Sequence, residues 1–463
     1  MVLTQAEVPA VATSVLDLIG NTPMVEIGNF DTGACRLFVK LENQNPGGSI
    51  KDRMAVSMVD AAEQSSRLQP GGIIVEATAG NTGLGLALVA AARNYKIIIV
   101  IPDKMSTEKI QHLHGLGADV RITRSDVDKQ HPENYVNLAR SIAESTPGAW
   151  FVDQFSNPAN PLAHEQTTGP EIWRQMGGAV DAVVCGVGSG GTITGLSRYF
   201  ARVSPQTEMV LADPSGSSLA EYIRTGELGP AGSYVVEGIG QSAVPPIADL
   251  SRVRRAYTIK DVRSLEIARA LLRQDGILAG SSSGTLVAAA LEYCREQKQP
   301  KRVVTFICDS GSKYLSKMFN DFWMRDQGYL QFPKANDLRD LIMRRHKQGA
   351  VITVGPEDSL LTAYQRMRMA DISQVPVIEN GRPVGMLDES DLLIAVHTDE
   401  QRFRDPVRSA MCTRLRTLPA DAPLEAVYQI LNEGLVAMVF DGNDFIGLIT
   451  RTDLLNFMRR RLR

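Results

Sequence analysis

The sequence predicts an α/β protein in which parallel sheets are covered by helices, followed by a smaller C-terminal α+β module. Three observations support this. Between about residues 71 and 307, short apolar runs rich in β-branched residues alternate with amphipathic stretches. Glycine-rich segments follow several of the apolar runs, and beyond residue 350 one pattern occurs twice. Such alternation is typical of parallel strands connected by helices.

The predicted strands are short apolar runs, and the predicted helices lie between them. Strands are predicted at 72–76, 96–101, 118–122, 182–185, 209–212 and 303–307, and helices at 84–93 and 107–116. In parallel sheets, ligands bind outside the carboxyl ends of the strands. The glycine-rich segments 78–83 and 186–191 fall at such ends, so we expect the ligand site there.

Length, composition and charge limit the class of protein. The 463 residues suggest about three domains, and 44% hydrophobic with 22% charged residues is typical of a soluble globular protein. A net charge of −3 offers no basic face for nucleic acid. No apolar run reaches membrane-spanning length, and the first residues lack the features of a secretory signal. We therefore expect no nucleic-acid or membrane partner.

The cysteines and histidines indicate neither a disulfide framework nor a metal site. The five cysteines are odd in number and far apart: Cys35, Cys185, Cys294, Cys308 and Cys412. The six histidines show no ligand spacing, and His112 and His114 point to different sides of a helix. This pattern fits a reducing cytoplasm, so we expect a cytoplasmic protein without a metal.

The chain changes character near residue 330. Residues 331–349 are polar and basic and are predicted to be a linker. Beyond them, residues 384–393 recur as 446–455, which indicates two similar domains. Each copy is too small to bury a core well alone, so we expect the two to pack together. The predicted domains are 1–330, 350–400 and 401–463.

Lys51 lies between a Pro-Gly-Gly turn and an expected helix start, in the run 45–53. Lysine forms Schiff bases with carbonyls and with pyridoxal phosphate. A lysine with that role must meet one atom from one direction, and a turn can aim it. Taken alone, the run fits an exposed turn lysine equally well.

Two loops at strand ends are candidates for anion binding. Residues 78–83 follow a strand and open a helix, where free amides and the helix dipole hold an anion such as a substrate carboxylate; Asn81 could also donate to a ring oxygen. A plain turn explains this loop as well. In 186–192, glycines allow close approach of a phosphate, and Ser189 and Thr192 add hydroxyl donors.

Ser310 follows the last predicted strand, in the segment 308–314. A hydroxyl there can hydrogen-bond a pyridine nitrogen without holding it protonated, which makes a cofactor a more moderate electron sink and suits elimination at a β-carbon. A helix N-cap is the alternative interpretation of this serine.

Together these motifs resemble the fold-type II pyridoxal-phosphate enzymes of the cysteine synthase and cystathionine β-synthase group. The resemblance covers residues 14 to about 330 and includes 18–23 near the start. It implies Lys51 as the Schiff-base lysine and pyridoxal 5′-phosphate as the cofactor. It implies cofactor contacts from Asn81, Gly188, Ser189, Gly190, Gly191, Thr192 and Ser310, and substrate contacts from Thr78, Ala79, Gly80, Thr82, Gln154 and Gly238.

Both branches of this group share features with the chain. Residues 320–324 and the C-terminal repeat resemble cystathionine β-synthases, whereas 167–173 resemble cysteine synthases equally. Ala79 stands where serine is common and Glu165 where tyrosine is common, and 241–243 match neither branch. No Cys or His precedes Cys35, so we expect no haem of the animal type.

The resemblance implies a β-replacement in which homocysteine displaces the hydroxyl of serine and gives cystathionine. With cysteine as the donor, the same reaction would release hydrogen sulfide. One alternative is a cysteine synthase that uses O-acetylserine and sulfide. An alternative of another class is an adenosyl-ligand sensor with an inactive enzyme core.

The C-terminal repeat resembles tandem cystathionine β-synthase (CBS) domains, the Bateman module that binds adenosyl ligands. In the second copy, Thr450 and Asp453 place a hydroxyl and a carboxylate on one helix face, and a carboxylate can bind both hydroxyls of a ribose. In the first copy, Asp391 is the counterpart and Asp388 replaces the hydroxyl. A helix capping box explains this pattern too. The resemblance implies S-adenosylmethionine or an adenine nucleotide as ligand, a structural role in building a dimer stays open, and we expect a homodimer or higher homo-oligomer.

Overall fold

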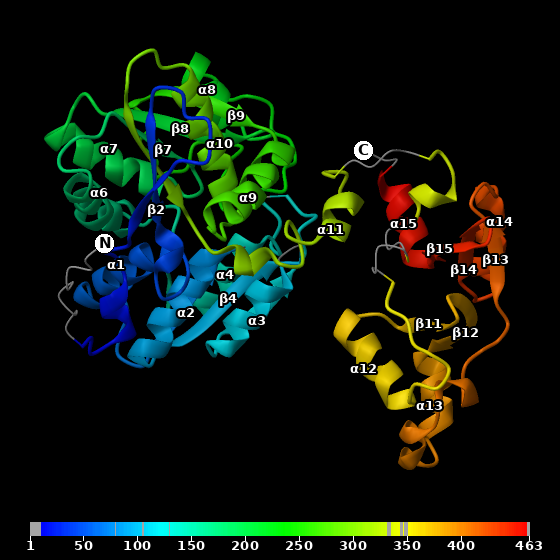
Figure 1. The fold of residues 1–463 in the computed structure, drawn as a ribbon. Coiled ribbons are helices and arrows are strands. Elements are labelled where there is room, and N and C mark those ends of the chain that lie inside the picture. The colour runs from blue at the N-terminus through cyan, green and yellow to red at the C-terminus, as the bar shows by residue number, and fades with distance from the viewer. Residues whose placement is uncertain are drawn as a thin grey trace. The chain divides into compact units, whose positions relative to one another are not determined.

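The computed structural model describes residues 11–78, 80–103, 106–128, 130–330, 335–342, 346 and 351–460. Ala79, predicted to bind substrate, lies outside the described residues, as does much of the predicted linker. The chain forms two compact units, Met1–Phe319 and Asn320–Arg463 (Figure 1). Both contain strands and helices, and the first contains parallel sheets, which confirms the predicted fold class.

A six-stranded sheet forms the centre of one half of the first unit, with strand order β1-β2-β10-β7-β8-β9. Its strands are β1 (Met24–Ile27), β2 (Arg36–Leu41), β7 (Ala182–Cys185), β8 (Glu208–Pro214), β9 (Val253–Ile259) and β10 (Arg302–Ile307). β1 pairs with β2 antiparallel, and the other pairs are parallel. β7 is buried along its whole length, as expected for a parallel strand covered on both faces.

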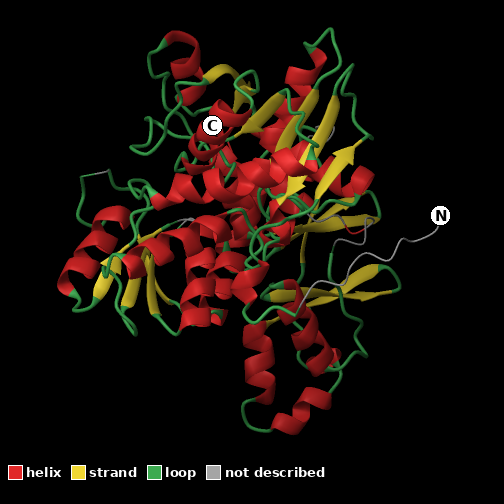
Figure 2. Cartoon of the chain, turned by 90° about the vertical axis from the view of Figure 1, so that its left-hand side faces the viewer, coloured by secondary structure: helices red, strands yellow, loops and turns green. Residues whose placement is uncertain are grey.

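The other half of the first unit contains a four-stranded parallel sheet with order β5-β4-β3-β6. Its strands are β3 (Ile73–Ala77), β4 (Lys96–Pro102), β5 (Asp119–Thr123) and β6 (Ala149–Phe151). Separate hydrophobic cores surround the two sheets, and helices lie against the strands of both (Figure 2). Two sheets with their own cores leave room for a ligand site at the strand ends.

Helices follow most strands of the first unit. They are α1 (Lys51–Gln64), α2 (Asn81–Arg93), α3 (Thr107–Gly115), α4 (Tyr135–Ser145), α5 (Ala159–Ala163), α6 (Gly169–Gln175), α7 (Gly191–Val203), α8 (Leu219–Thr225), α9 (Asp261–Asp275) and α10 (Ser281–Arg295). α2 begins inside the predicted carboxylate loop, and α7 begins inside the predicted phosphate loop. Both loops therefore place free helix N-terminal amides at strand ends, as the sequence predicts.

The C-terminal unit repeats one helix–strand–strand–helix arrangement. Its elements are α11 (Asp321–Asp326), α12 (Leu360–Ala370), β11 (Gln374–Glu379), β12 (Arg382–Asp388), α13 (Glu389–Val396), β13 (Arg416–Pro419), α14 (Leu424–Asn432), β14 (Ala437–Asp441), β15 (Asp444–Ile449) and α15 (Arg451–Arg460). Each antiparallel strand pair has a register irregularity, after Val377 in one copy and after Val439 in the other. Met386 of the first copy shares a buried cluster with Met438 and Phe445 of the second, which confirms that the copies pack together.

Within the described residues, no helix combines the length and hydropathy that crossing a bilayer requires.

Candidate active site

A pocket with about 530 Å³ of empty volume lies at the carboxyl ends of β7 and β10, beside the starts of α1, α2 and α7. The structure brings many predicted site residues together there. Those that line it are Lys51, Asn81, Gly188, Ser189, Gly190, Gly191, Thr192 and Gly238. The motifs come from distant parts of the sequence, so their meeting in one pocket is a property of the fold.

Lys51 is the first residue of α1, and the turn before it is held at both ends. The Gly47 N–H donates to Asp52 Oδ2 at 2.6 Å, and the Ile50 N–H donates to the Cys308 carbonyl at 2.9 Å. Gly48 has a φ of +74°, which favours glycine. The turn therefore joins the start of α1 to the end of β10, and the Lys51 side chain lines the pocket.

Burial lowers the pKa of Lys51, while the nearby Cys308 and Asp309 act in the opposite direction. A lowered pKa increases the share of neutral amine at physiological pH. The neutral amine is the form that attacks an aldehyde and accepts a proton.

The loop between β7 and α7 is a cradle in which the glycine positions have no room for a side chain. A Cβ on Gly188 would lie 2.3 Å from the Gly238 carbonyl oxygen, and one on Gly191 would lie 1.9 Å from Asn160 Oδ1. Ser189 Oγ accepts a hydrogen bond from Asn160 Nδ2 at 2.9 Å. Bare backbone at the N-terminus of the 13-residue helix α7 fits a phosphate group.

The described residues predicted to bind the carboxylate make two separate sets of hydrogen bonds at the start of α2. The Gly80 N–H donates to Thr78 Oγ1 at 3.1 Å, and the Thr82 hydroxyl donates to Gln154 Oε1 at 2.7 Å. Gln154 Nε2 in turn donates to Glu76 Oε1 at 3.2 Å. Burial raises the pKa of Glu76 to about 8, so the sequence-predicted Gln154 rests on a buried carboxyl group that the sequence did not point to.

Ser310 lies two residues beyond the pocket-lining Cys308. Its hydroxyl accepts from the Ser312 N–H at 3.2 Å and caps the 3₁₀ turn Gly311–Tyr314. The capping interpretation of Ser310 is therefore realised in the structure, and its contact with a pyridine nitrogen stays a prediction.

Two of the residues that depart from the family pattern, Glu165 and Gln241, have polar partners in the structure. Glu165 pairs with Arg202 and lies 4.0 Å from Arg198. The Gln241 N–H donates to Ser217 Oγ at 2.9 Å, which holds the backbone after Gly240. Glu165 therefore lies against α7, where a tyrosine hydroxyl would not make the same ion pairs.

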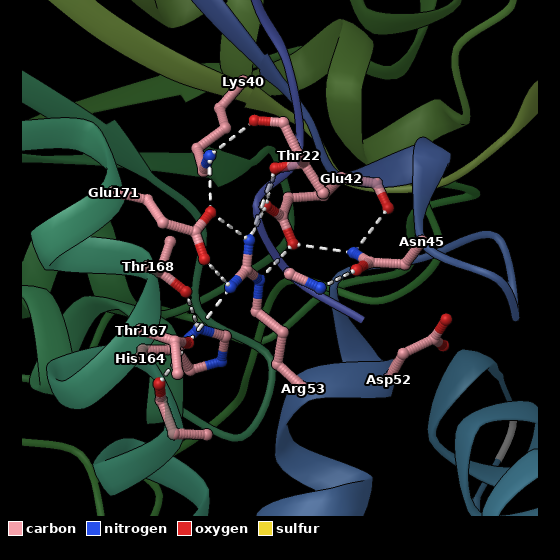
Figure 3. Close-up of polar contacts among 12 residues, drawn as sticks. Thr22, Lys40, Glu42, Asn45, Asp52, Arg53, His164, Thr167, Thr168 and Glu171 are labelled. Carbon is pink, nitrogen blue, oxygen red and sulfur yellow. Dashed lines mark hydrogen bonds and ion pairs between the residues drawn. The ribbon is translucent and has the colours of Figure 1, made fainter. Parts of the chain in front are cut away.

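A buried ion cluster surrounds Arg53, two residues after Lys51, and the sequence did not predict it. Figure 3 shows the Arg53 guanidinium between the carboxylates of Glu42 and Glu171, each 2.7 Å away. Lys40 Nζ lies 2.8 Å from Glu171. Burial acts to raise the pKa of Glu171, but Arg53 outweighs it and holds the pKa at about 2. The cluster fixes α1 two residues after Lys51, and its members are too far apart in sequence to form a local motif.

The sequence also did not predict a role for His164 in the site. Its ring nitrogens lie 3.0 Å from Thr168 Oγ1 and 3.2 Å from Thr192 Oγ1 in the phosphate cradle. Burial, then the charges of Lys51 and Arg53, lower its pKa well below the usual value. His164 thus supports Thr192 as an uncharged partner, and no metal-like spacing could have signalled this role.

The candidate nucleotide-binding residues of the C-terminal unit form caps of their own helices. Thr450 Oγ1 donates to Asp453 Oδ2 at 2.6 Å, and the Thr450 N–H donates to the same oxygen at 2.8 Å. In the first copy, the Asp391 N–H donates to Asp388 Oδ1 at 2.8 Å, and the Asp388 N–H donates back to Asp391 Oδ2 at 3.2 Å. Both copies therefore have the capping-box geometry, which leaves a ligand role for these residues a prediction.

Among the described residues, no group of His, Cys, Asp and Glu side chains is arranged to hold a metal ion.

Comparison with known proteins identifies the family to which the chain belongs. The pyridoxal-phosphate dependent enzyme family matches residues 15–309, and the CBS domain family matches 338–398 and 407–460. Cystathionine β-synthase of Apis mellifera is 34% identical over 96% of this chain and 90% of that protein. Cysteine synthase 1 of Neurospora crassa is 39% identical over 71% of this chain and 89% of that protein.

A solved structure, the O-acetylserine dependent cystathionine β-synthase of Helicobacter pylori, is 35% identical with a TM-score of 0.62. It covers 67% of this chain, and 99% of its own chain is matched. The family resemblance seen in the sequence is thereby confirmed. The chain belongs to the cystathionine β-synthase family of pyridoxal-phosphate-dependent enzymes and carries a tandem pair of CBS domains.

Proposed function

We propose that this protein is a cystathionine β-synthase that replaces the β-hydroxyl of L-serine with the thiol of L-homocysteine and releases cystathionine and water. One observation carries the proposal: the pocket gathers the Lys51 amine, Asn81 and a glycine cradle at the N-terminus of α7. Similarity to cystathionine β-synthases over nearly the whole chain supports the same activity.

We propose that Lys51 holds the aldehyde of pyridoxal phosphate, that the cradle from Gly188 to Thr192 holds its phosphate, and that Asn81 and Ser310 contact its ring. The cofactor, when bound, supplies an electron sink for negative charge at the substrate α-carbon. The bare backbone of the cradle and the lowered pKa of Lys51 fit this assignment. We expect no haem, so the purified protein should show the visible band of pyridoxal phosphate without a Soret band.

The remaining steps are assigned to side chains of this chain. The loop of Thr78, Gly80 and Thr82, with the α2 dipole and Gln154, holds the serine carboxylate. Ala79 belongs to the same proposed loop. The Lys51 amine takes the α-proton of serine and later returns it to the α-carbon. The β-hydroxyl takes up one proton and leaves as water, and the homocysteine thiol gives up one proton as its sulfur bonds to the β-carbon near the strip at Gly238, which lines the pocket.

Two observations support O-acetylserine as a second candidate donor. The Helicobacter pylori neighbour is an O-acetylserine dependent cystathionine β-synthase, and residues 241–243 match neither branch of the family. O-acetylserine is therefore the second candidate donor, with sulfide as the acceptor of a cysteine synthase. Cysteine as donor would release hydrogen sulfide.

A four-way assay tests the proposal. The purified enzyme is given serine or O-acetylserine, each with homocysteine or sulfide, and the products are identified by mass spectrometry. Cystathionine from serine and homocysteine at the highest kcat/KM is the expected result. If cystathionine forms only with O-acetylserine, the donor is O-acetylserine and not serine. If the only product is cysteine from O-acetylserine and sulfide, the protein is a cysteine synthase.

We propose that the CBS pair binds an adenosyl ligand, S-adenosylmethionine or an adenine nucleotide, with Thr450 and Asp453 in the second copy and Asp391 in the first. Isothermal titration calorimetry with S-adenosylmethionine and AMP, beside the activity assay, tests this. Binding without any β-replacement would instead indicate a sensor with an inactive core. We further propose a homo-oligomer in the cytoplasm, and the free state of all five cysteines is compatible with that compartment.

A further inference from the structure

Lys313 is a buried lysine that the proposed mechanism leaves unused. It lies in the 3₁₀ turn Gly311–Tyr314, and only 6% of the residue is exposed. Its ammonium donates to Asn81 Oδ1 at 2.8 Å and to the carbonyls of Gly47 at 3.0 Å and Gly48 at 3.3 Å. A buried ammonium needs such acceptors, because burying an unsatisfied charge is costly. These three acceptors belong to the two segments that carry Asn81 and Lys51.

The contacts of Asn81 fix which way its amide points. Asn81 Oδ1 faces the Lys313 ammonium, and Asn81 Nδ2 donates to Asp309 Oδ2 at 2.8 Å. An ammonium only donates and an ionised carboxylate only accepts. Rotating the amide by half a turn would place its NH₂ against the ammonium and its oxygen against the carboxylate. The cation and the carboxylate therefore hold one of the two orientations.

Asp309 is itself held in place. Its Oδ2 also accepts from the Tyr314 hydroxyl at 2.7 Å. A Cβ on Gly280 would lie 1.8 Å from Asp309 Oδ1, so the backbone at Gly280 packs directly against the carboxylate. The Asn81 amide is thus set between two groups, neither of which is free to turn with it.

The same ammonium holds the turn that precedes Lys51. The Gly48 carbonyl accepts from Lys313 Nζ and from the Ser310 N–H at 3.3 Å. Gly47 and Gly48 lie four and three residues before Lys51, in the turn that opens α1. The Lys313 side chain therefore connects the turn before Lys51 with Asn81, the proposed partner of the cofactor's ring oxygen. Both are thereby tied to the segment that carries Ser310.

We propose that Lys313 is a positioning residue for the cofactor. It holds the Asn81 amide so that one N–H of its NH₂ group donates to Asp309 and the other is left for the cofactor ring, and it fixes the turn that aims Lys51. The proposal rests on the proposed function, since that function assigns Asn81 to the cofactor ring. Burial lowers the pKa of Lys313, and the carboxylates of Asp309 and Asp52 oppose that effect.

The first test is the variant Lys313→Met in the holoenzyme. We expect the dissociation constant of pyridoxal phosphate, measured by equilibrium dialysis, to rise about tenfold, because a charged hydrogen bond is lost. We also expect the pH titration of the cofactor's visible band to shift, since the ring oxygen loses an ordered donor. Lys313→Arg, which keeps the charge and the donors, should restore most of the affinity.

Lys317→Met is the matched control. Lys317 lies on the same segment and pairs with Glu237 at 2.8 Å, so the variant removes a lysine without touching a residue that Lys313 contacts. It should leave cofactor affinity and the titration of the visible band unchanged. An equal effect in both variants would overturn the proposal, as would a Lys313→Met enzyme that binds cofactor like the parent.

A double-variant cycle separates positioning from general support of the fold. If Lys313 acts through Asn81, Lys313→Met should add less than its own tenfold effect once Asn81→Ala is present. Fully multiplicative effects would overturn the proposal. Thermal unfolding of each variant identifies one that has not folded. If Lys313→Met has not, Lys313→Gln replaces it; because glutamine lacks the charge, its loss of cofactor affinity should be smaller than tenfold but larger than that of Lys317→Met.

The cycle also distinguishes this proposal from the proposed function. A parent enzyme that forms cystathionine while Lys313→Met keeps its cofactor affinity leaves the function standing and removes the positioning role. The parent enzyme could instead bind pyridoxal phosphate but form no cystathionine, while Lys313→Met still weakens cofactor binding. That result removes the proposed function and leaves the positioning role standing.

Discussion

The two compact units hold their candidate ligand residues in different ways. In the first unit, Asn81 contacts Asp309 and Lys313, which are far away in sequence. In the C-terminal unit, Thr450 and Asp453 bond to each other across one helix start. The stability of the helix is enough to explain a local cap. It does not explain polar contacts that join distant segments around a pocket. The structure therefore supports a ligand role more strongly in the first unit.

The largest expected effect in this comparison comes from Lys51→Ala. The variant loses both the amine for the cofactor aldehyde and the base for the α-proton, so we expect cystathionine formation to fall at least about a thousandfold. Initial rates with saturating serine and homocysteine measure it. Lys301→Ala removes a lysine that pairs with Glu208 instead and should keep the parent rate. Turnover at the parent rate in the Lys51 variant contradicts the mechanism.

The next largest effect concerns the ion cluster around Arg53. Glu171→Ala leaves the buried Arg53 and Lys40 without one carboxylate, and we expect the free energy of unfolding of the first unit to fall by about 3–5 kcal/mol. Urea denaturation measures this change.

The pair Arg36–Glu26, at a similar distance of 2.6 Å but exposed, is the matched comparison. Glu26→Ala should change stability little, because solvent screens that pair. Equal losses in the two variants would show that burial of the cluster has no energetic consequence.

A smaller, pH-dependent effect is expected for Glu76→Gln. Burial raises the folded-state pKa of Glu76 to about 8, well above the 4.5 of an exposed glutamate. Between these values the folded protein binds a proton that the unfolded chain has released, so stability falls as pH rises, by at most about 1.4 kcal/mol per pH unit. Glutamine removes this slope and can still accept from Gln154.

Thermal unfolding midpoints of parent and Glu76→Gln between pH 5 and pH 8 test this sign. The advantage of the variant should grow with pH and level off above about pH 8. An advantage that is constant or shrinks over this interval would show that Glu76 is already ionised in the folded protein.

The smallest effects are expected at the two caps of the C-terminal unit. Thr450→Val and Asp388→Ala each remove one capping acceptor, so each should cost about 1 kcal/mol of stability. If Thr450 also contributes to ligand binding, only Thr450→Val should weaken S-adenosylmethionine binding in calorimetry. Equal affinities of the two variants for S-adenosylmethionine would show that Thr450 and Asp388 act only as helix caps.

Most of the first unit's architecture was predictable because its signals are local. The predicted strand 96–101 corresponds to β4 (Lys96–Pro102) and the predicted helix 107–116 to α3 (Thr107–Gly115). Lys51 and the two glycine-rich loops were found for the same reason, since turn residues and strand ends are visible in short windows.

The supporting residues could not be found in this way. Arg53, Glu76, His164 and Lys313 acquire their meaning from partners that tertiary packing brings to them. Arg53 and Glu171, for example, belong to α1 and α6, and nothing in either helix sequence specifies the other. Antiparallel β1 at the sheet edge was missed because Met24–Ile27 is interrupted by a glutamate and partly exposed, whereas the equally short Ala182–Cys185 is apolar and buried throughout.

Borohydride reduction of the purified holoenzyme, followed by peptide mass spectrometry, tests the central claim most directly. The account predicts a pyridoxyl phosphate adduct on the peptide that contains Lys51, and no such adduct in Lys51→Ala. A parent protein that yields no adduct, or carries it on another lysine such as Lys313, would contradict the assignment on which the proposed chemistry depends.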